Sequence, residues 1–191
     1  MTKRNFAPPL PFKVVAVLAM LAAISIICGK YLAIRGGDIL RFSFENLPII
    51  FAGLAFGPVS GVLVGVVADL VGCVMVGYTI NPIVTIGAAA IGGTAGICGF
   101  LLRKIGIKSV FTTIISVTAA HLIGSVIIKT FGLSAFYDMP LFALMLWRLL
   151  NYVIVGAIEA VLLVALLGNR EVYRLISSIK PRTKERDVEH K

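Results

Sequence analysis

The sequence is poor in the residues from which catalytic and metal sites are built. Its 191 residues include only two histidines and three cysteines, and one histidine, His190, lies in the C-terminal tail. No Walker A, HExxH, GxSxG or CxxC pattern occurs, so the sequence predicts no ATP site, zinc site or nucleophile elbow. Cys28, Cys73 and Cys98 are isolated within apolar runs, which predicts packing instead of a disulfide framework. We therefore expect no catalytic residue, no metal site and no cofactor.

Charge is also scarce, and its scarcity excludes a soluble domain. Charged residues make up 14% of the chain and hydrophobic residues 59%, and the mean hydropathy is +1.00. Between Asn46 and Gly96 the only formal charge is Asp69. This composition lies outside the range of soluble domains of this length, so the chain is predicted to be integral to a membrane.

The apolar segments are long enough for an all-α integral membrane bundle of six transmembrane helices. A helix needs about 20 apolar residues to cross the hydrocarbon layer. The helices are expected at about residues 12–33, 46–56, 59–76, 83–102, 110–131 and 141–167, in a single membrane domain 1–191 with a basic cytoplasmic tail at 170–191. The segment 46–56 is too short to cross alone, and Gly57-Pro58 then turns the chain.

The net charge of +9 is concentrated in three clusters, which predict the topology. Cytoplasmic loops collect Lys and Arg, and all three clusters fall on one side of a protein with six passes, so both termini are expected in the cytoplasm. Acidic residues interrupt the tail and no aromatic platform accompanies it, which argues against a nucleic-acid partner. The clusters are Lys3, Arg4 and Lys13; Arg103, Lys104 and Lys108; and Arg170, Arg174, Lys180, Arg182, Lys184, Arg186 and Lys191.

Small residues recur every four positions, which is typical of helices that pack closely in lipid. Gly53, Gly57, Gly61 and Gly65 predict that the helices at 46–56 and 59–76 pack on one another or on the first helix. Ala88, Gly92 and Gly96 repeat the pattern in the fourth helix. In the first helix, Ala19 and Ala23 could face either a neighbouring helix or a separate protein.

The polar residues of the predicted helices and of the connections between them gather at the outer membrane face. Arg148, Asn151 and Tyr152 share one helical face because they are three and four residues apart. An excess of cations suits an anionic ligand and aromatic side chains suit a flat ring, so a binding cup that opens outward is predicted. The gathered residues are Arg35, Asp38, Arg41, Glu45, Asp69, Tyr78, Asn81, Lys129, Arg148, Asn151 and Tyr152.

Several of these residues have an alternative interpretation. Asp69 could form a structural ion pair with Arg148 or Lys129, Lys129 could snorkel outward, and Tyr78 could be an interface anchor. A membrane-embedded enzyme or lipid-handling protein that uses His121 and Glu159 is the alternative of a different class.

A set of motifs runs along most of the chain: Arg41-Phe42-Ser43-Phe44, Leu47-Pro48, Ala52-Gly53, Phe56-Gly57-Pro58, Gly61 with Gly65, Ala68-Asp69-Leu70, Tyr78 with Pro82, and Ala19 with Ala23. In these motifs the chain resembles one family, the substrate-binding S components of energy-coupling factor (ECF) vitamin transporters. The chain is most similar to the folate type. Its outer turn, GYTINPIVT at residues 77–85, differs from the Pro- and Gly-rich turn of that type, so another vitamin or a nucleobase-like ligand stays open.

The resemblance implies a multi-pass protein of the bacterial plasma membrane that captures a vitamin, with folate as the first candidate, from outside. It further implies docking through Ala19 and Ala23 on a transmembrane coupling protein driven by two cytoplasmic ATPases, and toppling of the whole S component to release substrate inward. Arg41, Lys129 or Arg148 would meet the glutamate carboxylates of folate. The expected ligand-binding residues are Arg41, Asp69, Tyr78, Asn81, Lys129, Arg148, Asn151 and Tyr152.

Overall fold

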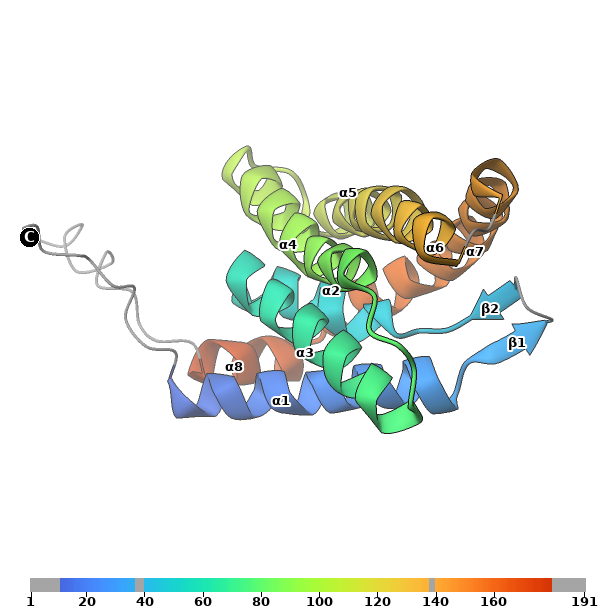
Figure 1. Cartoon of the computed structure of the whole chain (residues 1–191). Coiled ribbons are helices and arrows are strands. Elements are labelled where there is room, and N and C mark those ends of the chain that lie inside the picture. Colours follow the sequence, from blue (N-terminus) through green and yellow to red (C-terminus); the bar gives the residue numbers. More distant parts are fainter. Residues whose placement is uncertain (1–10, 37–39, 138–139, 180–191) are drawn as a thin grey trace, which may run out of the picture.

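The computed structural model describes residues 11–36, 40–137 and 140–179, which fold into a bundle of helices (Figure 1). In chain order the elements are α1 (Phe12–Ile26), η1 (Ile27–Tyr31), β1 (Ile34–Gly36), β2 (Leu40–Phe42), α2 (Asn46–Phe56), α3 (Pro58–Val76), α4 (Pro82–Lys104), α5 (Ser109–Ala120), η2 (His121–Ile128), α6 (Lys129–Tyr137), α7 (Leu141–Gly168) and α8 (Arg170–Ile179), where η denotes a π-helix.

The bundle confirms the predicted all-α membrane architecture. Among the described residues, five helical stretches are long and apolar enough to cross a membrane: 12–31, 58–76, 82–104, 109–136 and 141–168. The sixth, α2, has 11 residues and a length of about 17 Å, roughly half the hydrocarbon thickness. The expected position of both termini in the cytoplasm stays a prediction.

Proline, glycine and asparagine mark where the central helices begin and end. Pro58 opens α3 directly after Gly57, whose φ of 100° lies in a region that glycine occupies readily. Gly77 ends α3 in the left-handed conformation, with a φ of 69°. Asn81 caps α4, because its side-chain oxygen accepts hydrogen bonds from the backbone N–H groups of Ile83 and Val84 at 3.0 and 3.4 Å.

The glycine ladder packs α2 and α3 against α4. A Cβ at Gly53 or Gly61 would overlap the backbone of Gly92, and one at Gly65 would overlap that of Ala88. The prediction that α2 and α3 pack on one another is confirmed at Gly61, where a Cβ would lie 2.8 Å from Gly53 Cα. The other close partner of the ladder is the small-residue face of α4, which was not predicted. Gly57 does not belong to the ladder, since nothing lies within 4 Å of a Cβ built there.

The segment between the first two helices contains two short strands that form a hairpin. β1 pairs with β2 in antiparallel register, with Arg35 opposite Arg41. The hairpin extends beyond the helices at the right end of the bundle, and α8 lies at the opposite end (Figure 1). Arg170–Ile179, which the sequence analysis placed in the tail, are helical, and residues 180–191 lie outside the described part of the chain.

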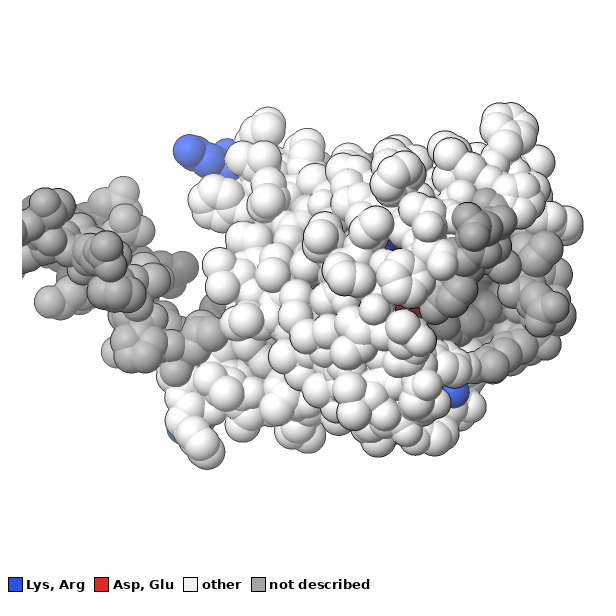
Figure 2. Space-filling view, in the orientation of Figure 1, with Lys and Arg blue, Asp and Glu red and all other residues white. Residues whose placement is uncertain are grey.

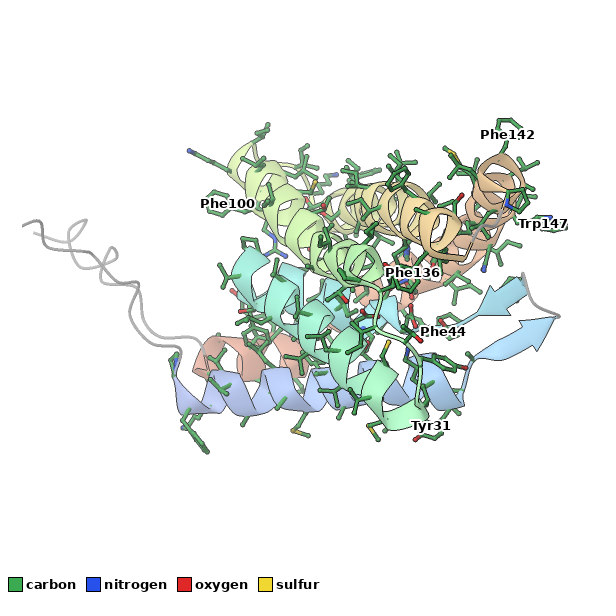
Figure 3. The ribbon with its side chains drawn as sticks, in the orientation of Figure 1. Tyr31, Phe44, Phe100, Phe136, Phe142 and Trp147 are labelled. Carbon is green, nitrogen blue, oxygen red and sulfur yellow. The ribbon has the colours of Figure 1, made fainter. Side chains whose placement is uncertain are left out.

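The outer surface of the bundle is typical of a protein in lipid. In Figure 2 the band between the two ends is almost wholly white, and Lys and Arg appear mainly toward the ends. Tyr31, Phe142 and Trp147 lie toward the right-hand end in Figure 3 and are 61%, 84% and 45% exposed. Aromatic side chains favour the level of the lipid headgroups, so these residues mark the membrane boundary nearest the hairpin.

Candidate ligand-binding site

A cavity lies between the helix ends next to the hairpin. It encloses a volume of about 860 Å³, including its opening to solvent. Figure 3 shows oxygen and nitrogen atoms between the helices in this half of the bundle, near Phe44 and Phe136. The lining residues are Lys30, Ser43, Glu45, Asp69, Cys73, Tyr78, Thr79, Asn81, Val84, Lys129, Leu133, Arg148, Asn151 and Tyr152.

A buried ion pair closes one wall of the cavity. Lys129 Nζ lies 3.1 Å from Glu45 Oε1, and the Lys129 side chain is only 6% exposed. Its stem packs over Gly87, where a Cβ would lie 2.5 Å from Lys129 Cγ. The alternative in which Lys129 snorkels outward was therefore wrong, because Glu45 holds the ammonium group inside the bundle.

Glu45 is itself fixed by the first helical stretch. Ser25 Oγ donates a hydrogen bond of 2.6 Å to the backbone carbonyl of Glu45. Gly29 leaves room for the Glu45 side chain, since a Cβ at Gly29 would lie 2.6 Å from Glu45 Oε2. Through its backbone carbonyl and its side chain, Glu45 thus joins α1, η1 and the start of α2 to the Lys129 side of the cavity.

Asp69 reaches the cavity from α3 and accepts a hydrogen bond from Thr85 Oγ1 at 2.7 Å. The structure gives Asp69 no ion pair with either Arg148 or Lys129, both of which are described. The structural ion pair considered as an alternative is therefore absent. Because a carboxylate can accept several hydrogen bonds, Asp69 retains acceptor capacity toward the cavity.

Asn81 has its side-chain amide engaged within the protein. Its oxygen caps α4, and its Nδ2 donates a hydrogen bond of 2.8 Å to the carbonyl of Gly132. The residue is 4% exposed. Asn81 therefore joins α4 to α6 and shapes the cavity wall more than it offers a free amide.

Arg148 lies on α7 between two neighbours. Its Nε donates to the Ser125 carbonyl at 3.1 Å and its Nη2 to the Tyr152 hydroxyl at 3.4 Å. The guanidinium carbon also lies 5.5 Å from the centroid of the Tyr152 ring. Among the residues that the structure describes, Arg148 has no carboxylate partner, so its positive charge is available to a ligand.

Lys30 is the second such cation, and the sequence analysis missed it. It lies in η1, with its Nζ 5.4 Å from the centroid of the Tyr78 ring and 3.8 Å from Cys73 Sγ. Its stem packs over Gly72, where a Cβ would lie 2.8 Å from Lys30 Cε. No carboxylate among the described residues pairs with Lys30. The clue in the sequence was a lysine at the end of an apolar run.

His121 and Glu159 lie beside the cavity but are not among its lining residues. His121 Nε2 is 2.6 Å from Glu159 Oε2, and their side chains are 4% and 0% exposed. The His121 ring stacks on the Tyr152 ring with centroids 4.9 Å apart. A pair so enclosed offers no access to a substrate, which disfavours the alternative of an enzyme built on these residues.

Seven of the eight predicted ligand-binding residues line this one cavity. The exception is Arg41, which lies in β2 but whose side chain is outside the described part of the structure. Lys30 and Thr85 were missed as site residues, because only the tertiary fold brings their distant segments together. Glu45 was expected in the binding cup, and it lines the cavity. Ala19 and Ala23 are exposed on α1, away from the cavity.

The chemistry of the lining suits recognition of a small polar molecule. Lys30 and Arg148, which no carboxylate of the described residues pairs, supply positive charge. Asp69 supplies an acceptor, and Tyr78 and Tyr152 supply aromatic faces. In the described part of the chain no three His, Cys, Asp or Glu residues are grouped as a metal site would require.

Comparison with known proteins identifies the architecture. Residues 13–167 match the family described as ECF transporter, substrate-specific component. No curated protein matches in sequence.

Three solved structures have a similar fold. FolT bound with folic acid is 22% identical, with a TM-score of 0.62 over 78% of this chain and 88% of that one. An S component of a bacterial ECF transporter is 18% identical, with a TM-score of 0.63 over 88% and 98% of the two chains. The biotin S component of an ECF-type ABC transporter is 23% identical, with a TM-score of 0.57 over 85% and 90%.

Proposed function

This chain belongs to the family of substrate-specific components of ECF transporters, and from that premise we propose that it captures a vitamin bearing an anionic group, with folate as the first candidate. The family consists of membrane transport proteins and not of enzymes. S components bind small vitamin ligands and work with ECF modules. The identity of the ligand, the side from which it enters and the composition of the module belong to the proposal.

The two cations without carboxylate partners support an anionic ligand. Lys30 and Arg148 both line the cavity, and their charge would be poorly compensated in a protein within lipid unless a ligand or water met it. Folate has two carboxylates on its glutamate moiety, which would meet these cations. The pterin ring would then lie near Tyr78, with ring N–H groups donating to Asp69.

The assay is calorimetric titration of the purified protein with folate, biotin, pantothenate, riboflavin and a thiamine precursor. The proposal expects tight binding of folate, and riboflavin, which lacks a carboxylate, should bind at least about 100-fold more weakly. A heat of binding with biotin but none with folate would refute the folate assignment and support a different anionic vitamin as the ligand. Tight binding of the thiamine precursor alone would overturn the anionic class.

Charge-removing variants test the two cations separately. Arg148→Gln and Lys30→Gln should each lower the affinity for folate by about tenfold to 100-fold. This is the effect expected for a hydrogen-bonded charge pair worth about 1.5–3 kcal/mol. Lys104→Gln is the matched control, because Lys104 is an exposed cation in the last turn of α4, at the opposite end of the bundle. An effect of the same size in the control would mean that net charge, and not local contact, governs binding.

We further propose that α1 docks on a transmembrane coupling protein. Ala19 and Ala23 are exposed on α1, and small side chains allow a second helix to approach closely in lipid. Ala19 also lines a wholly apolar groove between α1 and α3, together with Val15, Leu18, Ala22, Leu63, Val64 and Val67. Two cytoplasmic ATPases would drive the coupling protein, and toppling of the S component would release the vitamin inward.

Co-purification with the coupling module tests the docking. Ala19→Leu combined with Ala23→Leu should remove most of the complex, because the added side chains would hold the helices apart. Ala157→Leu combined with Ala165→Leu is the matched control, since both alanines are exposed on α7. A complex retained at the level of the control would exclude this face of α1.

The cavity end of the bundle is proposed to face outward across the bacterial plasma membrane, with both termini in the cytoplasm. Arg103 and Lys104 lie at the end of α4 opposite the cavity, as the positive-inside rule expects for a cytoplasmic end. An impermeant thiol reagent should label a cysteine placed at Thr79 from outside and one placed at Lys104 only after the cells are lysed. The reverse pattern would invert the topology.

A further inference from the structure

A closed network of side chains lies immediately beside the cavity, between η2 and α7. Glu159 pairs with His121, and His121 Nδ1 lies 3.4 Å from Ser125 Oγ. The His121 ring stacks on the Tyr152 ring, and the Tyr152 hydroxyl accepts a hydrogen bond from Arg148 Nη2. Arg148 Nε in turn donates a hydrogen bond of 3.1 Å to the backbone carbonyl of Ser125, which closes the network. Two members of the network, Arg148 and Tyr152, line the cavity, and the other three do not.

The π-helix makes this network possible. η2 (His121–Ile128) has i to i+5 bonding, which displaces carbonyl groups from the regular α-helical ladder. The Ser125 carbonyl accepts two hydrogen bonds, one from Thr130 Oγ1 at 3.5 Å and one from Arg148 Nε at 3.1 Å. The wide turn therefore presents an acceptor toward α7 at the level of Arg148.

The Glu159–His121 pair is too buried to be an incidental contact. The Glu159 side chain is 0% exposed, and a lone carboxylate in such a place costs several kcal/mol. Packing alone would be served as well by two apolar side chains of similar size, which often leave stability unchanged or improved. What apolar side chains could not supply is a hydrogen bond that fixes the plane of the imidazole ring.

We propose that Glu159 and His121 are positioning residues for the anion-binding part of the cavity. Glu159 fixes the His121 ring, and the ring holds Tyr152 by stacking. Tyr152 and the Ser125 carbonyl then hold the Arg148 guanidinium in one orientation toward the ligand. This inference rests on the proposed function, since it deepens the role of Arg148 in capturing an anionic group, but it makes a separate statement about the protein without ligand.

The decisive variant replaces both partners, His121→Leu with Glu159→Leu. It removes the stack and the hydrogen bond but leaves no buried charge, so it is expected to fold with a thermal midpoint close to that of the wild type. Glu159→Gln retains an acceptor for His121 and should rescue the positioning. Thr113→Val is the matched control, because Thr113 is buried on α5 and its hydroxyl donates a hydrogen bond to the backbone carbonyl of Ser109 in its own helix.

The readout without ligand is the ¹⁹F NMR spectrum of protein in which the five tyrosines carry a ring fluorine. Tyr152→Phe assigns the resonance of Tyr152. In the double leucine variant that resonance should shift or broaden, whereas Glu159→Gln and Thr113→Val should leave it in place. An unchanged Tyr152 resonance in the folded double variant would overturn the proposal.

The readout with ligand compares folate with its dimethyl ester, which lacks the glutamate charges. The double leucine variant should raise the Kd for folate by about tenfold, the lower end of what outer-shell partners contribute in other sites. It should change the Kd for the ester by less than about twofold. Equal losses for both ligands would indicate a general distortion of the cavity and would contradict positioning of Arg148. If the wild type binds neither ligand but the Tyr152 resonance responds as expected, the folate proposal fails and the positioning stands.

Discussion

The ion pair between Glu45 and Lys129 should contribute strongly to stability, and a double-mutant cycle can measure it. The two charged atoms are 3.1 Å apart, and the side chains are 20% and 6% exposed for Glu45 and Lys129. Removing one partner of a buried pair costs about 3–5 kcal/mol, because the remaining charge is left uncompensated. The partial exposure of Glu45 lets water reach the pair, so we expect about 3 kcal/mol for Glu45→Gln, the lower end of that range.

Replacing both partners should cost much less. Glu45→Gln with Lys129→Met removes the uncompensated charge and leaves side chains of similar size, so most of the loss should be recovered. For a chain of this length, about 3 kcal/mol corresponds to a fall of about 6–12 °C in the thermal midpoint. The double variant should lie within about 4 °C of the wild type.

Thermal unfolding in detergent can be followed with a thiol-reactive dye. Cys73 is buried, and Cys28 and Cys98 are half-buried, so unfolding exposes thiols that the dye then labels. A thermal midpoint of Glu45→Gln within 2 °C of the wild type would refute a strong contribution of this ion pair to stability. It is refuted equally if the losses of the two single variants simply add in the double variant, since additivity would mean that the side chains do not interact.

Three further variants test other contacts. Gly92→Ala would press a Cβ into the backbone of α3 and should destabilise the protein by about 3 kcal/mol or more. Gly168→Ala is its control and should be neutral in the same melting assay, since nothing lies within 4 Å of a Cβ built at Gly168. Gly29→Ala would push against Glu45 and should weaken folate by about tenfold in calorimetry, the size of effect that a small displacement of a positioning contact produces; unchanged affinity would show that this wall can adjust. Asn81→Ala removes the cap of α4 and the bond to Gly132 and should lower stability by about 2 kcal/mol; a melting midpoint equal to that of the wild type would contradict the structural role of its amide.

Much of the site could be predicted from residue type and membrane depth. A charged or amide side chain in an apolar helix is costly in lipid, so Asp69, Lys129, Arg148 and Asn151 were each expected to face a polar interior. Helical spacing placed Arg148 and Tyr152 on one face. The cavity contains all of these residues, although whether they bind a ligand stays a prediction.

The pairing of these residues could not be predicted in the same way. Lys129 had several acidic side chains available, and only the tertiary fold, in which Ser25 and Gly29 contact Glu45, brings Glu45 to Lys129. Lys30 resembled an ordinary end-of-helix lysine until α3 placed Gly72 beneath its stem. Such partners are distant in the chain, and periodicity within one helix carries no information about them.

The sequence by itself determined that this protein is a helical membrane bundle, because no soluble fold accommodates so much apolar surface with so few charges. Proline, glycine and asparagine also indicated where the central helices begin and end, since they act through local backbone geometry. Nothing in the sequence indicated that the fifth apolar helix continues to residue 136 or that Arg170–Ile179 form a helix. The tertiary structure alone decided that the glycine ladder faces α4, that His121 pairs with Glu159, and that Lys30 and Arg148 both line the cavity. These outcomes depend on which helix faces which, and that is settled by close packing of whole surfaces, which no local pattern encodes.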